Sequence, residues 1–208
     1  MRLYRANFSP SVERVTLALA HKGLEVESRW VSADDRSEVV EVSGQPLVPV
    51  LVDVRERVTN VVVDSMQIIG YIEDHVPTPP LFPSDEARFA ELMVFVDWFN
   101  RVWKLPPSRI AAELASDQPD HMLVTKLQRE MASALDGFES LLTGRRFLFG
   151  PELSAADCCA FPFLKYALKR EPADNDPVHL VLDEYQQLTD YHFKLRQWIT
   201  RVDALPRA

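Results

Sequence analysis

Short apolar runs and one amphipathic segment alternate along the first third of the chain. In residues 10–22 the apolar side chains recur every three or four positions, which is the spacing of a helix that buries one face, and Gly23 marks its end. Residues 3–5 and residues 25–31 have the pattern of strands, and the second alternates as a half-buried strand does. Residues 33–43 are polar and acidic and predict a loop with a weak helix. The order strand, helix, strand predicts a parallel pair with a right-handed crossover.

Two valine-rich runs follow, and they predict a hairpin. Residues 50–53 and 58–63 have strand composition, and the charged residues 54–57 between them are typical of a turn. A helical pattern over residues 65–75 comes next. Strand, helix, strand followed by strand, strand, helix is the order of a thioredoxin-like domain, which we expect at residues 1–76.

Prolines mark a boundary after this domain. Residues 76–83 contain four of the fifteen prolines, so they predict neither helix nor central strand but an extended linker at residues 77–83. The pattern after the linker is helical, and we expect an all-helical domain at residues 84–208. Its helices are expected at residues 84–103, 123–142, 154–164 and 185–202. Ser154 and Asp157 have the spacing of a capping box at the start of the third. The predicted fold class is therefore α+β.

Composition and charge exclude several classes of function. The 208 residues are 47% apolar, which is enough to bury the core of one large domain or two small ones. The net charge of −8 argues against nucleic acid as a partner, because phosphate binding needs a basic surface. We find neither a run of about 18 apolar residues nor the apolar core of a signal peptide, so we expect a cytoplasmic protein with no membrane partner. The five histidines and two adjacent cysteines lack the spacing of metal ligands, which argues against a metal site.

Ser9 and Pro10 lie where the first strand gives way to the first helix. Ser9 is a natural N-cap, and Pro10 suits the first helical position, where its missing N–H is not needed. The unpaired N–H groups of the first turn and the positive end of the helix dipole favour an anion beside Ser9, such as a thiolate. Taken alone, this pair of residues more often does no more than begin a helix.

Four short motifs together carry a resemblance to a known family. They are Ser9-Pro10 followed by Arg14-Val15, Val48-Pro49-Val50-Leu51, Asp64-Ser65 followed by Ile68, and Leu153-Ser154-Ala155-Ala156-Asp157. In this order and spacing, the chain resembles a cytosolic glutathione S-transferase of the serine type over nearly its whole length, with a first motif like those of the tau and zeta classes. The resemblance implies a thioredoxin-like domain followed by an all-helical one, a homodimer, and glutathione as co-substrate.

The resemblance also implies roles for particular residues. The Ser9 hydroxyl would donate a hydrogen bond to the sulfur of glutathione and lower the pKa of its thiol, which is about 8.5 for a free thiol. A cis bond between Val48 and Pro49 would expose the Val48 backbone, so that glutathione pairs with it like a short added strand. Asp64 would bind the ammonium of the γ-glutamyl group, and Ser65 its carboxylate. The residues alone leave open a trans proline and an ordinary N-cap pair.

The glycine carboxylate and the electrophile have candidate partners outside these motifs. The family commonly has Lys or Arg before Val-Pro, whereas this chain has Leu47, so Arg36 or Gln45 is the candidate to hold the glycine carboxylate. In this family the first helix of the second domain walls the electrophile pocket, which makes Phe99 and Trp103 candidates. Aromatic side chains recur every three or four positions over residues 95–103, and an aromatic stripe of this kind is more usually part of a core.

We therefore expect an enzyme that activates the thiol of glutathione for attack on a small-molecule electrophile, with no metal. Two alternatives remain open. One is a glutathione-dependent isomerase or peroxidase at the same site, and the other is a non-catalytic protein of this fold that binds partners. Within the sequence, the homodimer is favoured only by the charged residues 55–57 as a polar rim and by the aromatic stripe as an apolar centre.

Overall fold

The computed structural model describes residues 1–55 and 58–208. Contacts within the chain divide it into two compact units, one of Met1–Phe82 with Leu205–Ala208 and one of Pro83–Ala204. Glu56 and Arg57 belong to the predicted charged turn and to the predicted polar rim of a homodimer, and both lie outside the described residues.

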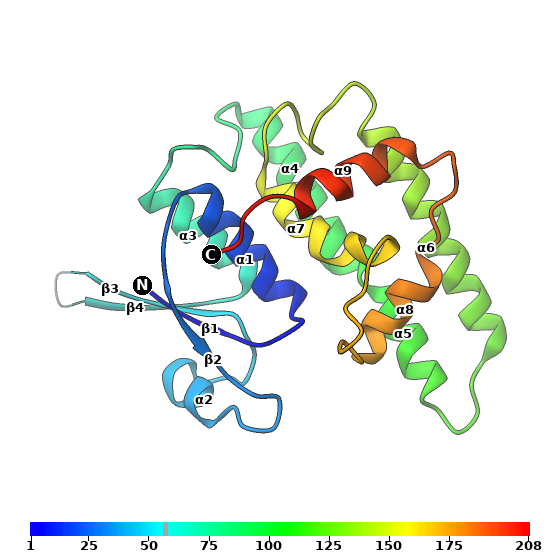
Figure 1. The fold of residues 1–208 in the computed structure, drawn as a ribbon, viewed down its shortest axis with the longest axis horizontal. Coiled ribbons are helices and arrows are strands. Elements are labelled where there is room, and N and C mark those ends of the chain that lie inside the picture. Colours follow the sequence, from blue (N-terminus) through cyan, green and yellow to red (C-terminus); the bar gives the residue numbers. More distant parts are fainter. Residues whose placement is uncertain (56–57) are drawn as a thin grey trace. The chain divides into compact units, whose positions relative to one another are not determined.

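The first unit contains a four-stranded mixed sheet (Figure 1). Its strands are β1 (Arg2–Arg5), β2 (Glu27–Trp30), β3 (Val50–Arg55) and β4 (Val58–Val63). They lie in the order β2-β1-β3-β4, with β1 parallel to β2 and antiparallel to β3, and β3 antiparallel to β4. The predicted parallel pair and hairpin are thus confirmed. The prediction of a half-buried second strand is wrong, because β2 lies at the edge of the sheet and all four of its residues are exposed.

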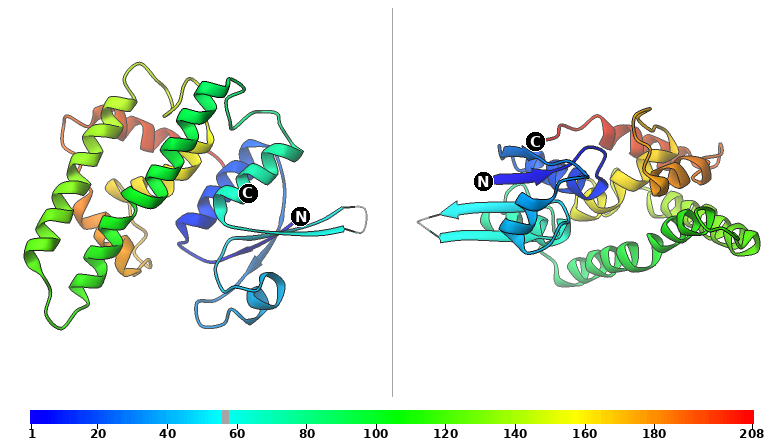
Figure 2. Two further views of the ribbon diagram at one scale, coloured as in Figure 1. Left: turned by 180° about the vertical axis from the view of Figure 1, so that it is seen from behind. Right: turned by 90° about the horizontal axis from the view of Figure 1, so that it is seen from below.

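Three helices cover the two faces of this sheet. They are α1 (Pro10–His21), α2 (Ser37–Ser43) and α3 (Ser65–His75). Successive residues of a strand point to opposite faces, so Leu3 packs in a core with residues of α1 and α3, whereas Tyr4 packs with Val39 of α2. Figure 1 and Figure 2 show α1 and α3 side by side on one face and α2 on the other. These three layers are the predicted thioredoxin-like arrangement.

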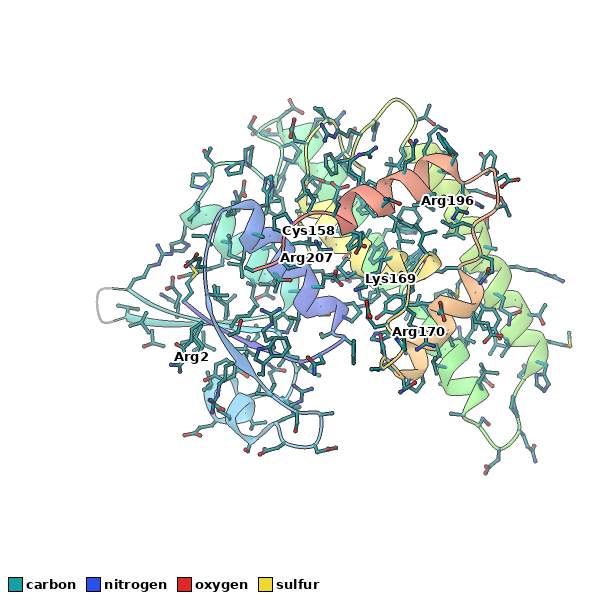
Figure 3. The ribbon with its side chains drawn as sticks, in the orientation of Figure 1. Arg2, Cys158, Lys169, Arg170, Arg196 and Arg207 are labelled. Atoms are coloured by element: carbon teal, nitrogen blue, oxygen red, sulfur yellow. The ribbon has the colours of Figure 1, made fainter. Side chains whose placement is uncertain are left out.

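The last residues of the chain also belong to the first unit. The Ala208 N–H donates to the Thr16 carbonyl of α1 over 3.1 Å, and Arg5 Nη1 donates to the main-chain oxygen of Ala208 over 2.8 Å. Arg207, labelled in Figure 3, forms an ion pair with Glu13 of α1. The first unit is therefore built from both ends of the chain.

The regular structure of the second unit is helical. Its helices are α4 (Glu86–Trp98), the π-helix η1 (Phe99–Trp103), α5 (Leu105–Leu114), α6 (His121–Leu141), α7 (Ala155–Leu164), the 3-10 helix η2 (Lys165–Ala167), α8 (Pro177–Tyr185) and α9 (Phe193–Asp203). The helix predicted at 84–103 changes to π geometry after Trp98, and α5, which was not predicted, begins with Pro106 and Pro107 in its first turn, where proline is tolerated. The single helix predicted at 185–202 is wrong, because residues 186–192 separate α8 from α9.

Helix α7 forms the centre of the second unit, and each of its ten residues is buried. Asp157 lies in its first turn and is 0% exposed. The Asp157 carboxylate accepts hydrogen bonds from Leu148 N (2.8 Å), Ser154 N (2.9 Å), Ser154 Oγ (2.6 Å) and Trp198 Nε1 (2.8 Å). The predicted capping box is confirmed, and the same carboxylate also connects α7 to α9.

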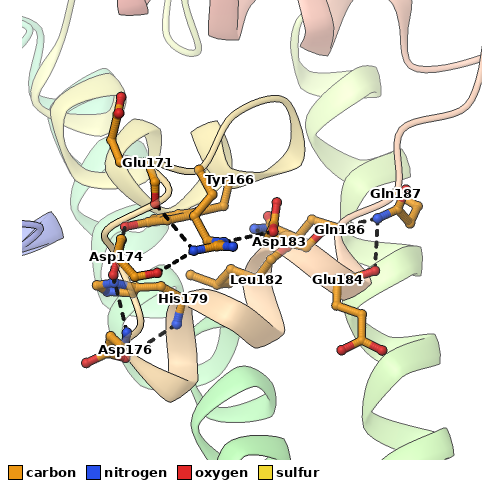
Figure 4. A network of polar contacts seen from close by, with 11 residues as sticks. Tyr166, Glu171, Asp174, Asp176, His179, Leu182, Asp183, Glu184, Gln186 and Gln187 are labelled. Carbon is orange, nitrogen blue, oxygen red and sulfur yellow. Dashed lines mark hydrogen bonds and ion pairs between the residues drawn. The ribbon is translucent and has the colours of Figure 1, made fainter.

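A second buried network fixes the segment between α7 and α8 (Figure 4). Tyr166 Oη donates to Asp174 Oδ2 over 2.6 Å, and His179 Nδ1 lies 2.9 Å from Asp174 Oδ1. Arg170 Nε donates to Asp183 over 2.9 Å. Burial acts to raise the pKa of Asp174, but the contacts with Tyr166 and His179 outweigh it and hold that pKa below its usual range.

Candidate functional site

The ends of three strands lie side by side in the sheet of the first unit. Tyr4 of β1 pairs with Val50 of β3, and Val50 pairs with Val63 of β4. Adjacent strands lie about 4.8 Å apart, so these positions are close neighbours. The predicted site residues that follow or precede them in the chain are Ser9, Val48, Pro49, Asp64 and Ser65. The topology therefore brings five of the predicted site residues to the neighbouring ends of β1, β3 and β4.

Ser9 lies at the N-terminus of α1, as predicted. Its backbone is extended (φ −82°, ψ 110°), Pro10 occupies the first turn, and Ser9 Oγ accepts a hydrogen bond from Val12 N over 3.3 Å. The hydroxyl hydrogen takes no part in that bond and has no acceptor among the described residues. Ser9 can therefore donate a hydrogen bond to an anion at the helix end.

Asp64 and Ser65 begin α3. Asp64 Oδ1 accepts hydrogen bonds from Met66 N (2.8 Å) and Gln67 N (3.1 Å), so Asp64 is an N-cap whichever other role it has. Its side chain is exposed, and Oδ2 makes no hydrogen bond within the part of the chain that the structure describes. One carboxylate oxygen thus caps the helix, and the other is available to a cation.

Arg14 belongs to the first motif but was assigned no role from the sequence, and the structure places it beside a predicted site residue. It is 2% exposed, and its Nη1 donates to the Ser65 hydroxyl over 3.3 Å, which joins α1 to the start of α3. The signal in the sequence is a charged residue surrounded by the apolar positions Val12, Val15 and Leu19 of α1. A buried guanidinium needs polar partners, so an arginine on the buried face of α1 indicates that polar groups pack against that face.

The loop before β3 contains two predicted residues with different surroundings. The Val48–Pro49 bond is cis, as the resemblance implies, and the Val48 backbone makes no hydrogen bond with any described residue. The Gln45 side chain, in contrast, is used within the loop. Its Nε2 donates to Ser43 Oγ (3.1 Å) and to the Leu47 carbonyl (3.0 Å), and its Oε1 accepts from Leu47 N (2.6 Å). Val48 therefore has free backbone groups, while Gln45 has little capacity left for a ligand.

Arg36 precedes α2 and is only partly exposed. Its Nη1 atom is buried and has no hydrogen-bond partner among the described residues. A buried donor without an acceptor is costly, by about 1–3 kcal/mol. The surroundings of Arg36 thus favour an anionic partner, which those of Gln45 do not.

Phe99 and Trp103 lie in the second unit, within an aromatic cluster. Their rings stack with centroids 4.4 Å apart, and both contact Phe138 and Phe163. Phe99 is 0% and Trp103 4% exposed. Trp103, but not Phe99, lines a cavity of about 740 Å³ between the η1–α5 segment and α6. Both residues are therefore part of a core, and only Trp103 is also at a cavity wall.

Residues 1–55 and 58–208 contain no group of three or more His, Cys, Asp or Glu side chains that could hold a metal ion. None of the helices described here is both long enough and apolar enough to span a membrane.

Two protein-family models match this chain. The model described as the N-terminal domain of glutathione S-transferase matches residues 3–80, and the model described as its C-terminal domain matches residues 122–192. Together the matches cover more than half of the chain.

Individual relatives are similar at low identity. Pyrimidodiazepine synthase of Drosophila melanogaster is 31% identical over 49% of this chain and 42% of its own length. The chain thus spans less than half of that relative. FtsZ-localized protein A of Caulobacter vibrioides is 28% identical over 76% of this chain and 73% of its own length. Among solved structures, a glutathione S-transferase from Rhodospirillum rubrum has a TM-score of 0.71 and 26% identity, and the match covers 99% of this chain and 88% of that one.

Proposed function

The chain belongs to the glutathione S-transferase family, and from that premise we propose that it activates the thiol of glutathione for attack on a small electrophile. The observation that carries the proposal is the position of Ser9 at the N-terminus of α1, where its hydroxyl donates no hydrogen bond to any described residue. A thiolate beside Ser9 would accept a hydrogen bond from this hydroxyl and would lie at the positive end of the helix dipole. Both effects lower the pKa of the thiol.

The proposed reaction needs no covalent bond to the protein. Glutathione loses its thiol proton to solvent, and the Ser9 hydroxyl stabilises the resulting thiolate. The sulfur lone pair then forms a bond to the electrophilic carbon. In a substitution, the leaving group departs with the electrons of the broken bond, whereas in an addition the product takes up a proton from solvent. Ser9 remains a hydroxyl throughout.

The rest of glutathione would bind at the same ends of β1, β3 and β4. We assign the γ-glutamyl ammonium to the uncommitted oxygen of Asp64 and its carboxylate to Ser65, which Arg14 holds in place. The Val48 N–H and carbonyl would pair with the peptide backbone of glutathione. For the glycine carboxylate we prefer Arg36 to Gln45, because Arg36 has a buried donor without a partner in the described structure.

Further parts of the proposal rest on the family. We propose a cytoplasmic homodimer with a glutathione-binding domain at residues 1–76, a linker at 77–83 and a helical domain at 84–208. For the electrophile, Phe99 and Trp103 remain the candidates. Trp103 is the better of the two, because it lines a cavity.

Calorimetric titration with glutathione tests the proposal. We expect saturable heat corresponding to one glutathione per chain, and conjugation of glutathione to an aryl chloride such as chlorodinitrobenzene. Oxidised glutathione and free cysteine serve as matched ligands, since each lacks part of the proposed set of contacts. A folded protein that gives no heat with glutathione would refute the proposal.

A second candidate is a binding protein of this fold without catalysis. It is favoured by the match to FtsZ-localized protein A, which covers 76% of this chain. This candidate predicts a folded protein with neither glutathione binding nor conjugation activity, so the same titration distinguishes the two.

A further inference from the structure

The C-terminal residues contact the helix that carries Ser9. The Ala208 N–H donates to the Thr16 carbonyl over 3.1 Å, and the main-chain oxygen of Ala208 accepts from Arg5 Nη1 over 2.8 Å. Ala208 also packs against the apolar core that α1 and α3 form with the sheet. These contacts fix the position of its neighbour Arg207 beside α1 (Figure 3).

Arg207 forms an ion pair with Glu13 of α1. Arg207 Nη2 and Nε lie 3.1 and 3.3 Å from Glu13 Oε1. The two side chains are only 23% and 17% exposed. Salt and solvent therefore screen these charges less than they screen a pair at an open surface.

Glu13 lies one helical turn from Ser9. The Glu13 N–H donates to the Ser9 carbonyl over 3.0 Å, and residues four apart in a helix lie on the same side. A carboxylate in the first turn is favourable to the helix dipole, which gives Glu13 a structural benefit. The same carboxylate repels an anion bound at Ser9 unless a cation neutralises it.

We infer that Arg207 is a positioning residue that acts through Glu13, because its guanidinium neutralises the carboxylate and keeps the start of α1 suited to a thiolate. The inference rests on the proposed function, in which Ser9 receives the thiolate of glutathione. It adds a residue from the far end of the chain, 194 positions from Glu13, to the groups that set the reactivity of the thiol.

Other charged side chains also face the first half of α1. Arg14 is buried against Ser65, Asp64 caps the neighbouring helix α3, and Arg5 extends from β1 to the C-terminal residues. At the opposite end of α1, Lys22 pairs with a carboxylate of α3. These groups are unchanged in the variants below, so differences between the variants report on Glu13 and Arg207.

The test measures the pKa of the thiol of bound glutathione, by ultraviolet absorbance of the thiolate in a pH titration of the complex. We expect Arg207→Ala to raise this pKa by about 1.5–2 units, the effect of one uncompensated charge roughly 6–8 Å away at an effective dielectric of about 20. Glu13→Gln should lower it by a similar amount. The double variant, which removes both charges, should return close to the wild-type pKa, and so should Arg207→Lys.

Arg196→Ala is the matched control. Arg196, labelled in Figure 3, is an exposed arginine of α9 in the second unit, and its Nη2 donates to the Leu188 carbonyl over 3.5 Å. Its removal changes the net charge of the protein as Arg207→Ala does, and we expect no shift in the thiol pKa.

The outcomes separate this inference from the proposed function. If wild-type protein does not bind glutathione, both are overturned. If it binds glutathione and Arg207→Ala leaves the thiol pKa unchanged, only the role of Arg207 is overturned. A shift that persists in the double variant would mean that Arg207 acts by packing and not by charge, which also overturns the inference. If Arg207→Ala does not fold, Glu13→Gln decides, because its thiol pKa must fall.

Discussion

Replacing Ser9 by alanine removes the hydroxyl on which the proposed mechanism depends. A hydrogen bond to a charged acceptor contributes about 1.5–3 kcal/mol. Its loss therefore corresponds to a rise of roughly one to two units in the pKa of the bound thiol, and to a fall of about tenfold to a hundredfold in turnover at neutral pH. We expect the affinity for glutathione to change little, since Arg14, Val48 and Ser65 keep their positions.

Ser9→Ala also removes a helix cap, and this effect must be separated from the chemical one. Ser9 Oγ accepts from Val12 N over 3.3 Å, and loss of an N-cap costs about 1 kcal/mol of stability. Asp85→Ala is the matched control, because Asp85 caps α4 in the other unit by accepting from Arg88 N over 2.9 Å. It should lower stability by a similar amount and leave the thiol pKa unchanged. Ser9→Thr, which keeps the hydroxyl, should restore most of the activity.

The assay combines initial rates of conjugation with titration of the bound thiol. Rates across a pH series give kcat and its apparent pKa, and ultraviolet absorbance gives the thiol pKa directly. If Ser9→Ala has the turnover and the thiol pKa of wild type, then Ser9 is a helix cap only and the thiolate is stabilised elsewhere.

Four further results are expected. Asp64→Asn keeps the N-cap of α3 but removes the charge, so calorimetry should show glutathione binding weakened by about 2 kcal/mol, whereas unchanged affinity would leave Asp64 as a cap alone. Asp157→Ala leaves buried donors unpaired, so urea denaturation should show a loss of about 3 kcal/mol or more. The lowered pKa of Asp174 contributes stability above the ordinary aspartate pKa and loses it as the pH falls through the folded-state value. Unfolding measured below about pH 4 should therefore depend less on pH in Tyr166→Phe than in wild type. Light scattering at micromolar concentration should give twice the monomer mass of 23.8 kDa, and a mass that stays at the monomer value would contradict the homodimer.

The sequence predicts those parts of the fold in which local pattern and tertiary packing agree. The period of α1 and the valine-rich composition of the hairpin are local signals, and each has its counterpart in the structure. The errors occur where the pattern is ambiguous. Pro106 and Pro107 look like helix breakers, although they begin α5, and periodicity alone does not reveal the break between α8 and α9.

The candidate site divides in the same way. Ser9 and Asp64 could be predicted because helix caps are local, and both are caps in the structure. The role of Arg14 could not be assigned, because its contact with Ser65 joins residues 51 positions apart and a charged residue among apolar positions does not identify its partner. Arg36 and Gln45 were equal candidates from the sequence. Only the folded loop shows that the Gln45 amide is bonded to its neighbours, while a guanidinium nitrogen of Arg36 has no partner in the described structure.

The residues that cap the helices differ in charge from one helix to another. Four helices, α3, α4, α6 and α8, are capped by aspartate side chains, which satisfy first-turn N–H groups and complement the helix dipole. Helices α1 and α7 are capped by serine instead. At α7 the reason is visible, since Ser154 Oγ donates to the buried carboxylate of Asp157 over 2.6 Å, where a second carboxylate would be repelled. No carboxylate of the described chain accepts from Ser9 Oγ. By the same reasoning, a serine suits the start of α1, where the Glu13 carboxylate of the first turn is paired with Arg207 and an anionic ligand can bind, and the thiolate of glutathione is an anion of that kind.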